Sequence, residues 1–163
     1  MKNKKVITST FLQISFSELN ENDQKLISNA ISSLNDAYAP YSGFLVGAAV
    51  LLDNGKIISA NNQENVAYPS GLCAERVAIY YAGAKFPSIG IKTIAITAKS
   101  KKFEIKDIIS PCGACRQAIA EYEVKQEGNI RILLHQSDNS VFIVESISEL
   151  LPFMFKSKDL KNY

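Results

Sequence analysis

Two stretches decide the fold of this chain: CAER at residues 73–76 and PCGAC at residues 111–115. They contain all three cysteines, and one acid, Glu75, lies two residues after the first cysteine. Cys112 and Cys115 are three residues apart, so at the start of a helix their sulfurs would share one face and could bind one ion. Helix-forming residues with apolar side chains at helical spacing follow each stretch. The sequence therefore predicts two helix N-termini that converge on a metal ion and favour thiolate over thiol.

The three sulfurs indicate a catalytic rather than a structural zinc site. A catalytic zinc ion has three protein ligands and one open position, whereas a structural zinc ion usually has four ligands. We therefore predict one Zn²⁺ per chain, bound by Cys73, Cys112 and Cys115. The only histidine, His135, ends an apolar run typical of a strand and would be the natural fourth ligand of a closed site. Structural zinc ligands tend to occur as two closely spaced pairs, which favours the open site.

The pattern C-x-E followed by P-C-x-x-C resembles the signature of zinc-dependent deaminases, in which a glutamate that does not bind the metal carries protons. Glu75 would take a proton from the attacking water and deliver it to the ring nitrogen and the leaving amine. The other reading of Glu75 is structural, because acids are favoured in the first turn of any helix. The remaining elements of the signature favour the catalytic role.

Two arginines lie beside the predicted ligands. Three thiolates on one divalent zinc leave the cluster negative, which would weaken the ion as a Lewis acid. Arg76 and Arg116 are placed to hydrogen-bond the sulfurs and reduce that charge. The alternative for both is an ordinary solvated helix face.

Further blocks extend the match over most of the chain, from about residue 38 to residue 155. In chain order they are YSGFLVGAA at 41–49, NQEN at 62–65, CAER at 73–76, SPCGACRQ at 110–117 and LLP at 150–152. Together they resemble the small, homotetrameric cytidine deaminases whose zinc is held by three cysteines. Five blocks in the family's order are far more specific than a lone C-x-x-C.

The resemblance implies a pocket for a nucleoside. Phe44 would flank the pyrimidine ring, and the backbone around Ala74 would read the amide edge of the base. Asn62 and Glu64 would hydrogen-bond the ribose hydroxyls, since an amide and a carboxylate offer both donors and acceptors. Without the resemblance, these are polar residues after a strand and a strand residue typical of a core.

The resemblance also implies a homotetramer with shared active sites. Tyr68 and Phe155 resemble residues that complete the pocket of a neighbouring subunit. Two segments depart from the family pattern: an N-terminal extension at 1–20, and the segment 99–109, which begins with Lys99-Ser100-Lys101-Lys102. We interpret the lysine cluster as a solvated loop.

Length and composition fit a single soluble domain over 1–163, with 47% hydrophobic and 21% charged residues. A net charge of +2 gives no broad footprint for nucleic acid. No apolar run approaches the ~20 residues of a membrane span, and the basic start is not followed by the apolar core of a signal peptide. Three cysteines within one metal pattern favour a reducing compartment, so we predict a cytoplasmic protein.

The pattern of apolar residues predicts an α/β fold, a three-layer α/β/α arrangement with a mixed five-stranded sheet like that of cytidine deaminases. The expected helices cover 24–37, the residues after Cys73, those after Cys112, and a short one at 147–151. The expected strands are 44–52, 57–61, 92–98, 130–135 and 141–144, with a hairpin turn at 53–56. Alternation at 12–16 indicates an added strand. The cluster 153–155 is expected to pack on the core or across a subunit interface.

The leading function is hydrolytic deamination of cytidine and 2′-deoxycytidine to uridine and 2′-deoxyuridine with release of ammonia, a reaction of pyrimidine salvage. Alternatives keep the chemistry but change the substrate to a nucleotide, a base in nucleic acid or a nucleoside antibiotic. Two others are different in kind. One is a non-catalytic structural zinc module, and the other is a thiol-disulfide enzyme built on Cys112 and Cys115, which leaves Cys73 unexplained.

Overall fold

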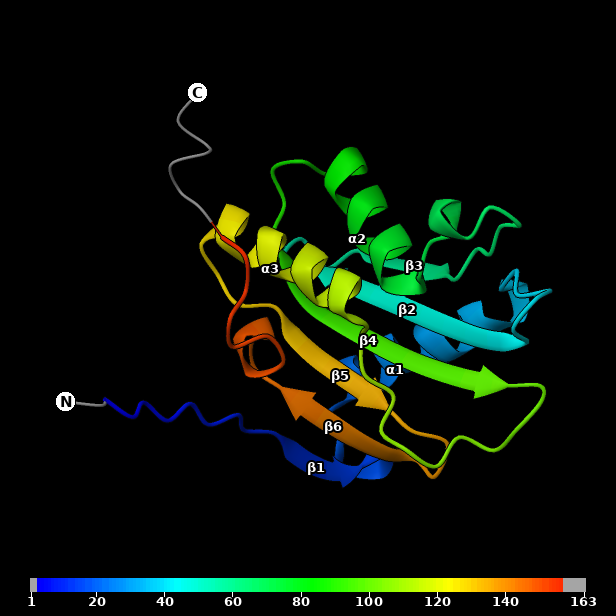
Figure 1. The fold of residues 1–163 in the computed structure, drawn as a ribbon, viewed down its shortest axis with the longest axis horizontal. Coiled ribbons are helices and arrows are strands. Elements are labelled where there is room, and N and C mark those ends of the chain that lie inside the picture. Colours follow the sequence, from blue (N-terminus) through cyan, green and yellow to red (C-terminus); the bar gives the residue numbers. More distant parts are fainter. Residues whose placement is uncertain (1–2, 157–163) are drawn as a thin grey trace.

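A computed structural model, which describes residues 3–156, contains a six-stranded mixed sheet (Figure 1). The strand order is β1-β6-β5-β4-β2-β3, with β4 and β5 parallel and each of the other neighbouring pairs antiparallel. The strands are β1 (Leu12–Ser15), β2 (Phe44–Leu52), β3 (Ile57–Asn61), β4 (Ile91–Ser100), β5 (Arg131–His135) and β6 (Ser140–Val144). The predicted mixed sheet is confirmed with six strands instead of five, because the N-terminal extension supplies β1.

Helices cover both faces of the sheet, as Figure 1 shows with α1 behind it and α2 and α3 side by side in front. The helices are α1 (Glu21–Ser33), α2 (Ala74–Lys85) and α3 (Gly113–Gln126), with short 3-10 turns at Phe16–Glu18, Leu34–Asp36, Tyr68–Ser70 and Ile147–Glu149. Leu26 and Ile27 of α1 pack in a core that includes Ala49 of β2. Ile79 of α2 and Ile119 of α3 belong to a second core on the opposite face. The three-layer prediction is confirmed.

The two helices of the front layer begin where the sequence places the cysteines. Cys73 is the N-cap of α2 and Cys112 is the N-cap of α3. The long β2 strand, buried on both faces along its centre, holds both helical layers together. None of the helices in the described residues is long and apolar enough to cross a bilayer.

Two predicted boundaries differ from the structure. The first helix begins at Glu21 instead of residue 24, because the Asn20 side chain caps it by accepting from the Asp23 N–H at 3.0 Å. It ends at Ser33, where a 3-10 turn follows. The lysine cluster is only partly a loop, because β4 continues to Ser100 and pairs that residue with Phe44 of β2.

Helix α1 approaches β2 closely at Gly47. A Cβ atom built at Gly47 would lie 2.0 Å from the Ala30 carbonyl oxygen and 2.7 Å from the Ser33 hydroxyl. Both Ala30 and Ser33 belong to α1. A residue without a side chain is therefore needed at this position to bring the helix onto the sheet.

We expect Gly47→Ala to lower the free energy of unfolding by about 1–3 kcal/mol, because the backbone of α1 must move away from β2. Urea titration followed by circular dichroism measures this change. Gly128→Ala is the matched control, since its Cβ would meet no atom closer than 3.9 Å. Equal unfolding midpoints for the two variants would contradict the close approach of α1.

Candidate active site

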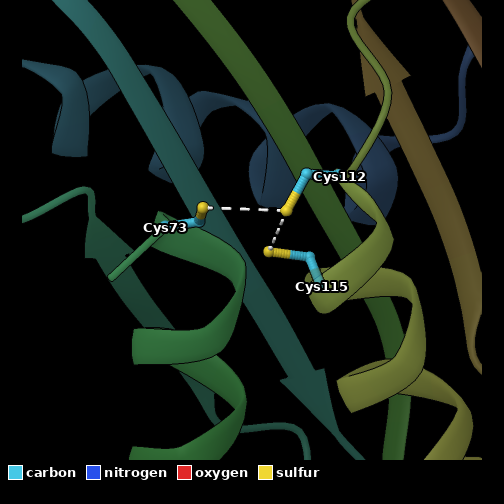
Figure 2. Close-up of side chains that lie close together, drawn as sticks. All are labelled: Cys73, Cys112 and Cys115. Atoms are coloured by element: carbon cyan, nitrogen blue, oxygen red, sulfur yellow. Dashed lines mark hydrogen bonds between the residues drawn. The ribbon is translucent and has the colours of Figure 1, made fainter. Parts of the chain in front are cut away.

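Three sulfurs meet where α2 and α3 begin (Figure 2). The Cys112 Sγ lies 3.9 Å from the Cys73 Sγ and 3.5 Å from the Cys115 Sγ. The three atoms lie within 4.8 Å of one another. Zinc–sulfur bonds of about 2.3 Å in tetrahedral geometry would place sulfurs about 3.8 Å apart, so the cluster has the size that a zinc ion needs.

The ionisation of the cysteines also fits a cation. Hydrogen bonds from Cys115, Arg76 and Cys112 lower the pKa of Cys73 to about 5, although burial opposes the shift. The pKa of Cys115 is raised, first by its hydrogen bond to Cys73 and then by burial. One thiolate therefore suppresses ionisation of the next, and a bound divalent cation would allow all three sulfurs to be deprotonated together.

His135 does not complete this cluster. It lies at the end of β5, where Nδ1 is 3.0 Å from the Thr97 hydroxyl and Nε2 is 3.4 Å from the Asn139 amide oxygen. Burial lowers the pKa of His135, which keeps the ring neutral. The hypothesis of a closed site with His135 as fourth ligand is wrong, and the three sulfurs fit an open zinc site.

Glu75 lies in the first turn of α2 and is 4% exposed. Its Oε2 atom is buried and has no hydrogen-bond partner in the described structure. Burial raises the pKa of Glu75, and the negative charge at Cys73 raises it further. An exposed first-turn acid would show none of these properties, whereas a group that exchanges protons with a bound substrate would show all of them.

The two arginines have different positions. Arg76 donates from Nη2 to the Cys73 sulfur over 3.8 Å, as predicted. Arg116 donates from Nε to the Pro111 carbonyl at 2.7 Å, from Nη1 to the Leu150 carbonyl at 2.7 Å, and from Nη2 to the Ser110 hydroxyl at 3.0 Å. The prediction that Arg116 hydrogen-bonds the sulfurs is therefore wrong. All three of its nitrogens hold the backbone that leads into Cys112.

A cavity of about 770 Å³ opens beside the sulfurs. It brings together eight of the residues singled out in the sequence: Phe44, Asn62, Glu64, Tyr68, Cys73, Glu75, Arg76 and Cys112. Ala74 is fully buried between two of these residues in the chain. The structure thus collects most of the predicted site around one space large enough for a small molecule.

The polar side chains of the cavity are already fixed by the backbone of β2 and the turn before it. The Asn62 amide donates to the Phe44 carbonyl at 2.9 Å and accepts from the Val46 N–H at 2.8 Å. The Glu64 carboxylate accepts from the N–H groups of Tyr41 and Ser42 and from the Ser42 hydroxyl. These bonds leave one amide hydrogen of Asn62 and lone pairs of Glu64 for other partners.

Phe155 lies outside this cavity. Its backbone N–H and carbonyl are hydrogen-bonded to the Gln117 side chain of α3. Its ring is 72% exposed, and that of Phe153 is 87% exposed. The alternative in which the 153–155 cluster packs on its own core is therefore wrong for these two rings, although Met154 packs partly against the core.

Several cavity residues were not found from the sequence. Tyr41, Ser42 and Leu72 form part of the lining, as do Ile108 and Ile109 from the segment before the second cysteine pair. The adjacent isoleucines were a usable signal, because two large apolar residues are unusual in a solvated loop.

The comparisons with known proteins agree with this geometry. A family model described as the cytidine and deoxycytidylate deaminase zinc-binding region matches residues 20–127. The chain belongs to this family. It is 35% identical over 139 residues to a cytidine deaminase of Halalkalibacterium halodurans, covering 85% of this chain and 98% of that protein. It is 38% identical over 139 residues to a probable cytidine deaminase of Dictyostelium discoideum, covering 84% and 86%.

Solved structures of the family have the same fold. A crystal structure of cytidine deaminase from Burkholderia pseudomallei matches with a TM-score of 0.71 at 35% identity, over 81% of this chain and 98% of that one. The cytidine deaminase from Mycobacterium tuberculosis matches with a TM-score of 0.65 at 27% identity, over 85% and 100%. The family and its fold, as inferred from the sequence motifs, are confirmed.

We expect Arg76→Ala to weaken zinc binding about 10- to 100-fold, because the Cys73 sulfur loses its charged donor. Competition with a chromogenic chelator measures the change. Arg76→Lys keeps the charge and should lose less affinity. Equal zinc affinity in Arg76→Ala and the unmodified protein would mean that the arginine has no part in holding the metal.

Proposed function

We propose that this chain catalyses the zinc-dependent hydrolytic deamination of cytidine and 2′-deoxycytidine to uridine and 2′-deoxyuridine, with release of ammonia. One observation carries the proposal: a buried carboxylate oxygen of Glu75 without a partner, beside three sulfurs and against a cavity of about 770 Å³. The names of the relatives, which are cytidine deaminases, support the choice of substrate.

Cys73, Cys112 and Cys115 would hold Zn²⁺, which supplies Lewis-acid activation of water at neutral pH when bound. Glu75 takes a proton from the water that adds to C4 of the base and passes it to the ring nitrogen N3. A second proton from the same water reaches the exocyclic amine through Glu75. The C4–N bond then breaks, ammonia leaves, and the C4 carbonyl remains. The raised pKa of Glu75 suits a group that must both accept and donate.

The cavity walls orient the nucleoside. Phe44 flanks the pyrimidine ring, and the backbone around Ala74 hydrogen-bonds the amide edge of the base. Asn62 and Glu64 bind ribose hydroxyls with the groups that their contacts to β2 leave free. Glu64 is ready as an acceptor, because the Ser42 hydroxyl and then the backbone N–H groups of Tyr41 and Ser42 lower its pKa.

A partner subunit completes the site. Tyr68 is 75% exposed at the rim of the cavity, and the ring of Phe155 is exposed beside α3. Such aromatic exposure in an isolated chain favours burial against another copy. We therefore propose a homotetramer with shared active sites, working in the cytoplasm in pyrimidine salvage. The three cysteines, which form no disulfide, are compatible with a reducing compartment.

We expect the purified protein to contain about one zinc per chain and to deaminate cytidine and 2′-deoxycytidine far faster than cytosine or the monophosphates. Loss of ultraviolet absorbance measures turnover, and atomic absorption counts the metal. Preference for a monophosphate would replace the nucleoside with a nucleotide substrate. Absence of zinc would remove the proposed chemistry and leave the thiol-disulfide alternative.

We expect Glu75→Gln to lower kcat about 10²- to 10⁴-fold while zinc content stays unchanged, because the amide keeps the shape but cannot carry protons. Glu21→Gln is the matched control, since Glu21 is an exposed acid in the first turn of α1. Equal activity of the two variants would identify a structural zinc module.

A further inference from the structure

The segment 101–103, which follows β4 on the way to α3 (Figure 1), contacts the turn at 41–44 through three independent interactions. The Lys101 N–H donates to the Gly43 carbonyl at 2.9 Å. The Lys102 ammonium donates to the Tyr41 carbonyl at 2.7 Å. The Phe103 ring stacks on Phe44, with ring centroids 6.2 Å apart and planes 19° apart.

The aliphatic part of Lys102 adds a fourth contact. Gly43 has a φ of +68°, and a Cβ built on it would lie 3.1 Å from the Lys102 Cε and 3.4 Å from its Cγ. The lysine stem therefore lies against the α-carbon of Gly43. A left-handed turn with no side chain of its own is covered by a side chain 59 positions later in the sequence, counted from 102 − 43.

The 41–44 turn in its own part holds two cavity residues. The N–H groups of Tyr41 and Ser42 and the Ser42 hydroxyl donate to the Glu64 carboxylate. The Phe44 N–H donates to the Ser42 hydroxyl oxygen at 2.9 Å. The positive charge of Lys102 is also close enough to Glu64 to contribute to its lowered pKa, after the hydrogen bonds from Ser42 and Tyr41.

Phe44 and Glu64 face the cavity, whereas Lys102 and Phe103 do not line it. Phe103 therefore lies behind Phe44, and Lys102 lies behind the turn that binds Glu64. Rigid support of this kind matters because a side chain that reads a substrate must already be in place when the substrate arrives.

We propose that Lys102 and Phe103 are positioning residues for substrate binding, which hold Phe44 and Glu64 in their binding positions through the 41–44 turn. The inference rests on the proposed function only for the identity of the substrate. Lys102 acts on the sugar end of the cavity through Tyr41, Ser42 and Glu64. Phe103 acts on the base end through Phe44. Neither residue takes part in the proton transfers, which belong to Glu75.

Kinetics with two nucleosides test the Lys102 arm. We expect Lys102→Met to raise KM for cytidine about three- to tenfold, with kcat and zinc content unchanged, because a charged hydrogen bond to the turn is lost. With 2′,3′-dideoxycytidine, which lacks the hydroxyls that Glu64 would bind, the same variant should change KM less than twofold. Lys102→Arg should recover most of the cytidine value. Lys106→Met is the matched control, since Lys106 is an exposed lysine of the same segment.

The Phe103 arm has the opposite substrate dependence. We expect Phe103→Ala to raise KM by a similar factor for both nucleosides, because both carry the base that Phe44 would flank. Phe103→Tyr, which keeps the ring, should restore it. Equal effects of Lys102→Met on both nucleosides, or KM values like those of Lys106→Met, would overturn the proposal.

Hydrogen exchange makes the test independent of activity. The N–H groups of residues 41–44 are each hydrogen-bonded within the turn or to Glu64. We expect them to exchange at least tenfold faster in Lys102→Met and Phe103→Ala, with β2 amides at 48–50 unchanged. Unchanged exchange at 41–44 would overturn the proposal. Failure of the unmodified protein to deaminate cytidine would reject the proposed function alone, and the exchange result would then decide whether the turn is held as described.

Discussion

The structure depends on the meeting of two helix N-termini at one point above the sheet. Cys73 and Cys112 each occupy an N-cap position, and Cys115 lies one turn further along α3. Both helices direct their positive ends at the sulfurs, which stabilises negative charge there. The relative position of α2 and α3 is in turn set by the core they share with β2, β4 and β5. The metal centre is therefore as precise as the packing of the two helices.

The cluster and its neighbours form one electrostatic unit. Thiolate charge at Cys73 raises the pKa of Glu75, while the Arg76 guanidinium bonds the same sulfur. A cation between the sulfurs would relieve the repulsion among them and change the charge that Glu75 experiences. Burial is what makes these effects large, because Glu75 is 4% exposed and water cannot screen it. One carboxylate can thus have a proton affinity suited to catalysis only because it lies next to the ligands.

The parts of the site that were predictable from sequence are those encoded locally. The spacing of Cys112 and Cys115 and the acid two residues after Cys73 indicate helix starts that share an ion, and the structure places them so. Arg116 could not be placed in this way, because its partner Leu150 is 34 residues distant and belongs to a C-terminal turn. The sixth strand was indicated by alternation at 12–16, but its pairing with β6 is a long-range property of the sheet.

The same distinction separates the chemistry of the site from its selectivity. The sulfurs and Glu75 lie on the first turns of helices, where the backbone geometry is nearly invariant and a short motif determines the arrangement. Phe44 and Glu64 instead take their positions from a turn that is held by a segment some 60 residues later, through Lys102 and Phe103. Loops accept changes in length and sequence more readily than packed helices do. A chain with unchanged zinc chemistry can therefore acquire its own fit to the sugar and the base through the 101–110 segment, and local sequence patterns carry no record of which turn that segment supports.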